Sequence, residues 1–132
     1  MSRGEQLAYY QQKLAFEMDP VDLWLALKAE ENIVVVDGRN RAAFEREHIP
    51  GALSLPHRAL CIDTTQQLDP SKVYICYCDG IGCNASTQTA LKLLTLGFQV
   101  KELIGGLDWW KRDGYATEGH QGRDGTPVSC GC

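Results

Sequence analysis

The stretch "KVYICYCDGIGCNAS", residues 72–86, decides the fold because it links a strand pattern to the start of a helix pattern. Its first part, Lys72–Tyr77, is rich in β-branched and aromatic residues, which favour a strand. Its last two residues begin the segment "ASTQTALKLLTLGF", residues 85–98, whose apolar spacing favours a helix. Two thiols, Cys78 and Cys83, lie in the glycine-containing loop between them. The stretch therefore predicts a strand, a loop with two cysteines, and a helix.

Strand and helix patterns alternate along the rest of the chain. The predicted strands are residues 16–18, 33–36, 52–55, 72–77 and 99–104, and the predicted helices are residues 5–14, 19–31, 39–48, 85–98 and 105–115. Asp19 and Pro20 suit the N-cap and first position of the second helix. The apolar run 33–36 is typical of a strand buried on both faces of a parallel sheet. The chain is expected to be a doubly wound α/β domain, with a central, mostly parallel five-stranded sheet and helices on both faces.

Two helices carry an apolar face in the sequence. Apolar residues of the first helix recur at helical spacing, at Leu7, Tyr10, Leu14 and Ala15. In the helix 85–98 the residues Ala90, Leu91, Leu94 and Phe98 fall on one face. In the last helix Trp109 and Trp110 are adjacent and cannot share a face. One tryptophan should pack in the core, and the other should form a pocket wall or a partner contact.

Size and composition set the class of protein. The 132 residues, with 44% hydrophobic and 23% charged residues, fit one globular domain. No apolar run approaches the ~18 residues that span a bilayer, and no apolar signal segment opens the chain, so we expect a cytoplasmic protein without a membrane partner. A net charge of −4 argues against nucleic acid as a partner. We expect no cofactor and no bound metal.

Cys78 has the surroundings that a reactive thiol needs. The nucleophile is the thiolate, and an ordinary cysteine has a pKa near ~8.5. The loop enters the N-terminus of a helix, whose free N–H groups favour negative charge. Gly80 and Gly82 allow successive amides to point inward as an anion nest. We therefore predict a substrate-binding loop at the carboxyl end of the strand, formed by Asp79, Gly80, Ile81, Gly82, Cys83 and Asn84.

The other cysteines have different expected roles. Cys76 lies inside the strand and should be an inert core residue. Cys61 has no assigned role. Cys130 and Cys132 lie in an irregular tail, residues 119–132. They could bind a soft metal with ligands from elsewhere, accept sulfur from Cys78, or belong to an unstructured terminus.

Three separated motifs resemble the rhodanese family. They are "VVVDGRNRAAFEREHIPGALSLP", the "YC" that precedes the glycine loop, and "LIGGLDWW". The resemblance covers residues ~15–116 and implies a single rhodanese-like domain over residues 1–132, with the helix 5–14 before it. It implies mainly structural roles for Asp37, Arg39, His48, Gly51 and Trp110. His57 follows the end of another strand, and we expect it either to be a solvated loop residue or to border the active-site crevice at the carboxyl ends of the strands.

The resemblance also implies an activity. Rhodanese-type sulfurtransferases move sulfane sulfur through a cysteine persulfide, and Cys78 matches their catalytic cysteine. The implied donor is thiosulfate, a persulfide or a polysulfide, and the implied acceptor is cyanide, a thiol or a sulfur-relay protein. The alternatives are a persulfide carrier or interaction module with little turnover, and a dithiol redox protein that uses Cys78 and Cys83.

The loop departs from the family pattern in three ways. It is longer, and no Lys or Arg lies between Lys72 and Lys92, so thiosulfate should bind weakly. A phosphatase of the related Cdc25 type would need a loop arginine to hold phosphate, which argues against that activity. The third departure is Cys83. It is a candidate resolving thiol, a replacement nucleophile, or a residue that only fills space at the helix start.

Overall fold

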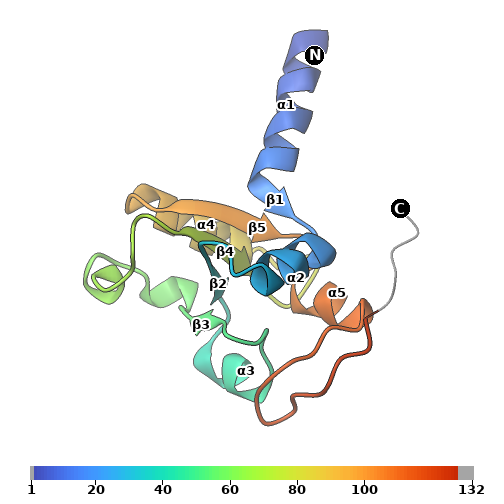
Figure 1. The fold of residues 1–132 in the computed structure, drawn as a ribbon. Coiled ribbons are helices and arrows are strands. Elements are labelled where there is room, and N and C mark those ends of the chain that lie inside the picture. Colours follow the sequence, from blue (N-terminus) through green and yellow to red (C-terminus); the bar gives the residue numbers. More distant parts are fainter. Residues whose placement is uncertain (1, 128–132) are drawn as a thin grey trace.

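The structure is a computed structural model that describes residues 2–127 (Figure 1). Its strands are all parallel and lie in the order β1-β5-β4-β2-β3. The strands are β1 (Glu17–Met18), β2 (Ile33–Asp37), β3 (Leu53–Ser54), β4 (Val73–Tyr77) and β5 (Gln99–Leu103). The α-helices are α1 (Arg3–Phe16), α2 (Pro20–Lys28), α3 (Arg41–Arg46), α4 (Ala85–Thr95) and α5 (Gly106–Arg112), and two 3₁₀ turns, His57–Ala59 and Asp63–Thr65, lie between β3 and β4. The predicted α/β class and parallel sheet are confirmed.

Local sequence signals explain where two of the helices begin. The Asp19 side chain accepts a hydrogen bond from the backbone N–H of Asp22 at 3.0 Å, and Pro20 occupies the first turn of α2. In the same way, the Asn40 side chain accepts from the N–H of Ala43 at 2.9 Å and caps α3. These caps satisfy N–H groups that have no partner inside the helix.

The sheet is covered on both faces by apolar layers. Helices α2 and α5 lie on one face and α4 lies on the other (Figure 1). One buried cluster contains Leu23, Val35, Ile49, Ile75, Tyr77, Leu103, Leu107, Trp110 and Tyr115, and the other contains Val36, Tyr74, Cys76, Ala90, Leu93 and Phe98. Trp110 is the core tryptophan, whereas Trp109 is 40% exposed.

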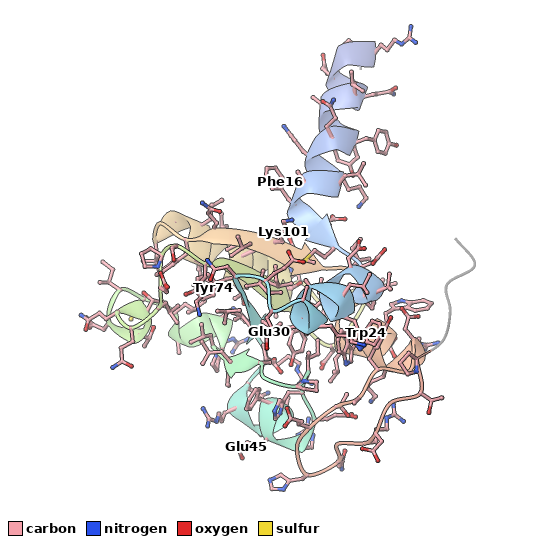
Figure 2. The ribbon with its side chains drawn as sticks, in the orientation of Figure 1. Phe16, Trp24, Glu30, Glu45, Tyr74 and Lys101 are labelled. Atoms are coloured by element: carbon pink, nitrogen blue, oxygen red, sulfur yellow. A yellow bond between two sulfur atoms is a disulfide. The ribbon has the colours of Figure 1, made fainter. Side chains whose placement is uncertain are left out.

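Two predicted apolar faces are not fully buried within the domain. Of the face predicted for residues 85–98, Ala90 and Phe98 are buried, but Leu91 and Leu94 are exposed. Leu93 is the buried leucine of α4, so the prediction was wrong for two of its four residues. Helix α1 projects from the domain and buries no residue (Figure 1). Leu91 and Leu94 line an apolar groove of about 560 Å³ that also includes Phe16 and Lys101, both labelled in Figure 2.

Candidate active site

Cys78 lies at the carboxyl end of the central strand β4, where the loop to α4 begins. The start of α5 holds this loop in place. The N–H of Leu107 donates to the carbonyl of Cys78 at 2.9 Å, and the N–H of Asp108 donates to the carbonyl of Asp79 at 2.8 Å. A Cβ at Gly106 would clash with the Cys78 carbonyl oxygen, so only glycine permits this approach.

A buried polar network lies directly behind Cys78. The Tyr77 hydroxyl donates to Asp37 Oδ2 at 2.7 Å and accepts from the N–H of Ile49 at 3.1 Å. Asp37 and Tyr77 are fully buried. Burial and the Asp37 charge raise the pKa of Tyr77, so its hydroxyl stays protonated and can donate. The network joins the ends of β2 and β4 to the segment that contains Pro50 and Gly51.

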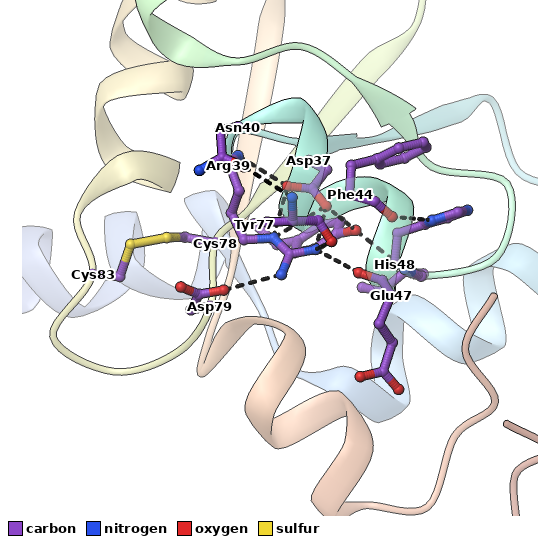
Figure 3. Close-up of polar contacts among 12 residues, drawn as sticks. Asp37, Arg39, Asn40, Phe44, Glu47, His48, Tyr77, Cys78, Asp79 and Cys83 are labelled. Atoms are coloured by element: carbon purple, nitrogen blue, oxygen red, sulfur yellow. Dashed lines mark hydrogen bonds and ion pairs between the residues drawn. A yellow bond between two sulfur atoms is a disulfide. The ribbon is translucent and has the colours of Figure 1, made fainter. Parts of the chain in front are cut away.

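Arg39 connects this network to the loop, as Figure 3 shows. Its guanidinium donates to Asp37 Oδ2 at 2.7 Å, to the carbonyl of Glu47 at 2.6 Å and to Asp79 Oδ1 at 3.0 Å. Burial lowers the pKa of Arg39, but the hydrogen bonds to Asp37 and Asp79 and the charge of Asp37 outweigh burial and raise it. These acceptors occupy the guanidinium, which favours a structural role.

The other residues of the structural motif lie nearby. His48 Nδ1 is 2.7 Å from the carbonyl of Phe44, and the His48 backbone pairs with that of Glu118. Gly51 has φ +78°, a left-handed conformation that suits glycine in the turn. The indole N–H of Trp110 donates to the carbonyl of Ala116 at 2.9 Å. These contacts support structural roles for His48, Gly51 and Trp110.

The loop brings Cys83 back onto Cys78. The N–H of Cys83 donates to the carbonyl of Gly80 at 3.2 Å, and Gly82 has φ +93°. The two cysteines are joined in a disulfide with their Cα atoms 6.3 Å apart (Figure 3). This separation lies within the range of ordinary disulfides. The sequence alone left this pairing open.

Cys78 is only 2% exposed, yet it lines two cavities together with Cys83. The smaller cavity, about 190 Å³, also contains Lys13, Glu17 and Glu102. The larger cavity, about 350 Å³, is lined by Gly38, Arg39, Asn40, Pro56, His57, Arg58, Cys78, Asp79, Cys83 and Ala85. Carboxylates outnumber cations in the first cavity, and arginines outnumber carboxylates in the second. An anion should therefore enter beside Arg58.

Backbone amides of the loop are available for an anion. Among residues 2–127, no acceptor is present for the N–H groups of Gly80, Ile81, Gly82 and Asn84, or for those of residues 85–87 at the start of α4. Most of these residues line the two cavities. Unpaired amides at a helix N-terminus favour negative charge.

Arg58 and Lys13 are the cations that sequence reasoning missed. Both lie outside the loop, on the 3₁₀ turn His57–Ala59 and on α1, and only the fold brings them to the cavities. His57 borders the larger cavity, as one prediction allowed. Burial and the nearby charges of Lys92 and Arg58 lower the pKa of His57, so its ring is neutral at pH 7.

The remaining cysteines lie apart from this site. Cys76 is fully buried in the core, where burial raises its pKa to about 12. Cys61 is exposed and lies beside Thr64, whose hydrogen bonds lower the pKa of the thiol. Cys130 and Cys132 lie outside the described residues. In residues 2–127 no group of three His, Cys, Asp or Glu is placed to hold a metal ion, and no helix is long and apolar enough to cross a membrane.

Comparison with known proteins gives matches over most of the chain. The family model described as Rhodanese-like domain matches residues 19–113. A thiosulfate sulfurtransferase GlpE of Coxiella burnetii is 33% identical over 97 residues, which cover 72% of this chain and 86% of that protein. A thiosulfate sulfurtransferase GlpE of Pseudomonas putida is 33% identical over 109 residues, which cover 81% of this chain and 94% of that protein.

Solved structures give the same picture. The BH2092 protein of Bacillus halodurans is 42% identical and superposes with a TM-score of 0.87, covering 92% of this chain and 89% of that one. The rhodanese-like domain of the Anabaena sp. Alr3790 protein is 30% identical with a TM-score of 0.72, covering 86% of this chain and 91% of that one.

Proposed function

Because the chain belongs to the rhodanese-like family, whose model matches residues 19–113, we propose that it is a sulfurtransferase that carries sulfane sulfur on Cys78. The observation that carries this proposal is the position of Cys78. Cys78 directly follows the central strand β4, and its side chain lines two cavities beside a loop with unpaired amides. These amides favour a thiolate before the reaction and a persulfide anion after it.

The reaction proceeds in two displacements. The Cys78 thiolate attacks the outer sulfur of thiosulfate, the bond between the two sulfur atoms breaks, and sulfite leaves with the electron pair. Cyanide or a thiolate then attacks the outer sulfur of the persulfide and regenerates the Cys78 thiolate. Covalent catalysis of this kind gives ping-pong kinetics. A persulfide or polysulfide can replace thiosulfate as the donor in the first step.

The cavity that contains Arg58 is the expected entrance for an anionic donor. The loop has no cation of its own, and Arg39 is engaged with Asp37 and Asp79. Arg58 adds an attraction of about 1 kcal/mol in a water-like environment, which is roughly fivefold in affinity. We therefore expect R58Q to raise the KM for thiosulfate roughly fivefold. The control R41Q, an exposed arginine that lines neither cavity, should leave it unchanged.

Steady-state sulfur transfer to cyanide by the reduced protein tests the main proposal. With thiosulfate and with polysulfide, C78S should fall to the background rate, and C61S should retain the full rate because Cys61 lies outside the site. Full activity of C78S would contradict the proposal. A wild-type protein that gains sulfur from a donor but turns over little would instead be a carrier in a sulfur relay.

The disulfide favours a second candidate function, a dithiol redox protein that uses Cys78 and Cys83. Such a protein needs no sulfane sulfur and exchanges only two electrons and two protons with a substrate. It would oxidise or reduce dithiols at a constant rate whether or not a sulfur donor is present. Dithiol oxidation that requires a sulfur donor would exclude this function.

A further inference from the structure

We infer that Cys83 discharges the Cys78 persulfide as hydrosulfide, so that the protein also acts as a dithiol-dependent releaser of sulfide. This activity rests on the proposed function, because it begins with sulfane sulfur on Cys78. It adds a second fate for that sulfur, one that requires no cyanide or thiol acceptor at the outer sulfur. Its substrates are a sulfane sulfur donor and a dithiol reductant.

The first support is the atom that Cys83 reaches. The disulfide places the Cys83 sulfur directly on the sulfur of Cys78. In the persulfide, that Cys78 atom is the inner sulfur, bonded to the transferred sulfur. A thiolate that attacks it displaces the outer sulfur, whereas attack on the outer sulfur would only move the persulfide to Cys83. The state shown in Figure 3 is thus the product expected from attack on the inner sulfur.

The second support is the construction of the loop. The hydrogen bond from Cys83 N–H to the Gly80 carbonyl and the left-handed Gly82 return the chain toward Cys78 within five residues. At the other end, the Cys78 and Asp79 carbonyls are fixed by α5. Two thiols held in one short loop react without the entropy cost of a bimolecular encounter. Cys83 therefore competes well with an external acceptor.

The third support is space for the departing sulfur. Cys78 and Cys83 both line each of the two cavities. The outer sulfur can occupy one of these cavities while Cys83 approaches Cys78. Hydrosulfide is a better leaving group than an alkyl thiolate because its conjugate acid is the stronger acid.

The step balances without an added oxidant. The Cys83 thiolate forms a bond to the Cys78 sulfur, and the bond between that sulfur and the outer sulfur breaks. The outer sulfur leaves with the electron pair and takes up the proton that the Cys83 thiol lost on ionising, so it departs as HS⁻. The sulfane sulfur is reduced to sulfide, and the two cysteine thiols are oxidised to the disulfide. A dithiol reductant such as dithiothreitol then reduces the disulfide and restores both thiols.

A single-turnover experiment tests this inference. The reduced chain is freed of reductant without oxygen, loaded with polysulfide or thiosulfate, freed of donor, and left without an acceptor. The wild type should release about one sulfide per chain and then lack two hydrogen masses relative to the reduced chain. C83S and C83A should keep the mass of one added sulfur and release at least roughly tenfold less sulfide.

Matched controls separate Cys83 from the other thiols. C61S and the double variant C130S/C132S should release sulfide as the wild type does. Circular dichroism shows whether the Cys83 variants are folded, and retention of the added sulfur shows that Cys78 is still reactive. Loss of release in the tail variant, or equal release by C83S and the wild type, would overturn the inference.

The outcomes also separate this inference from the function on which it rests. If C83S gains no sulfur from either donor, the proposed sulfurtransferase fails, and sulfide release fails with it. If both C83S and the wild type gain sulfur and keep it equally long, sulfur transfer stands and only the role of Cys83 is overturned. An added sulfur found on Cys83, without sulfide release, also overturns it.

Discussion

Removing the Tyr77 hydroxyl should destabilise the protein far more than the loss of one oxygen atom suggests. In Tyr77→Phe, Asp37 loses a hydrogen bond of 2.7 Å, and a hydrogen bond to a charged group contributes about 1.5–3 kcal/mol. The N–H of the fully buried Ile49 loses its acceptor, which costs about 1–3 kcal/mol more. We expect the free energy of unfolding to fall by about 3 kcal/mol. With a urea m-value near 2 kcal/mol per molar, the midpoint should fall by about 1.5 M.

Tyr74→Phe is the matched control, because Tyr74 is also buried in β4 and its hydroxyl donates to a single neutral acceptor, the Asp69 carbonyl, at 2.8 Å. Its loss should cost about 0.5–1.5 kcal/mol. Urea unfolding of both variants in the presence of a reductant compares the two without a contribution from the disulfide. Equal losses of stability in the two variants would refute the reasoning, because the Asp37 network would then contribute no more than a single hydrogen bond to a neutral acceptor.

Two further predictions concern acid stability and the loop. Burial alone would raise the pKa of Glu47, but hydrogen bonds from Lys111 and Thr117 outweigh burial and lower it. Ionised Glu47 should therefore stabilise the fold above its unfolded-state pKa of about 4.3, and this contribution should be lost as the pH falls through the folded-state pKa. E47Q should flatten this acid loss in urea unfolding measured from pH 3 to 7, and an unchanged acid slope would contradict the assignment. G106A should lower sulfur transfer as well as stability, because its Cβ would meet the Cys78 carbonyl. G97A, which is also at positive φ but in open space, should lower stability alone, and equal loss of sulfur transfer in both variants would be the contrary result.

The sequence predicted the strands and helices well because their signals are local. Alternating buried strands and helices are encoded by apolar spacing, and the Asp19 and Asn40 side chains act within three residues of their own position. The buried face of α4 was predicted less well. Its exposed residues Leu91 and Leu94 are as apolar as the buried Leu93, so periodicity could not define which leucine faces the sheet.

The site shows the same division between local and distant signals. The position of Cys78 follows from the strand end and the glycine loop, both of which are contiguous in sequence. Arg58 lies in a connection without clear periodicity, and only tertiary contacts bring it beside the loop. The pairing of Cys83 with Cys78 depends on how the loop turns at Gly82, and residue spacing alone leaves several turns open.

The most direct test of the account is to locate the transferred sulfur by peptide mass spectrometry. Reduced C83S protein is treated with thiosulfate or polysulfide, alkylated to trap persulfides, and digested. The account predicts one added sulfur, assigned to Cys78 by fragmentation of the peptide that also contains Cys76, with the buried Cys76 unmodified. Added sulfur on Cys61 or the tail cysteines, with none on Cys78, would contradict it.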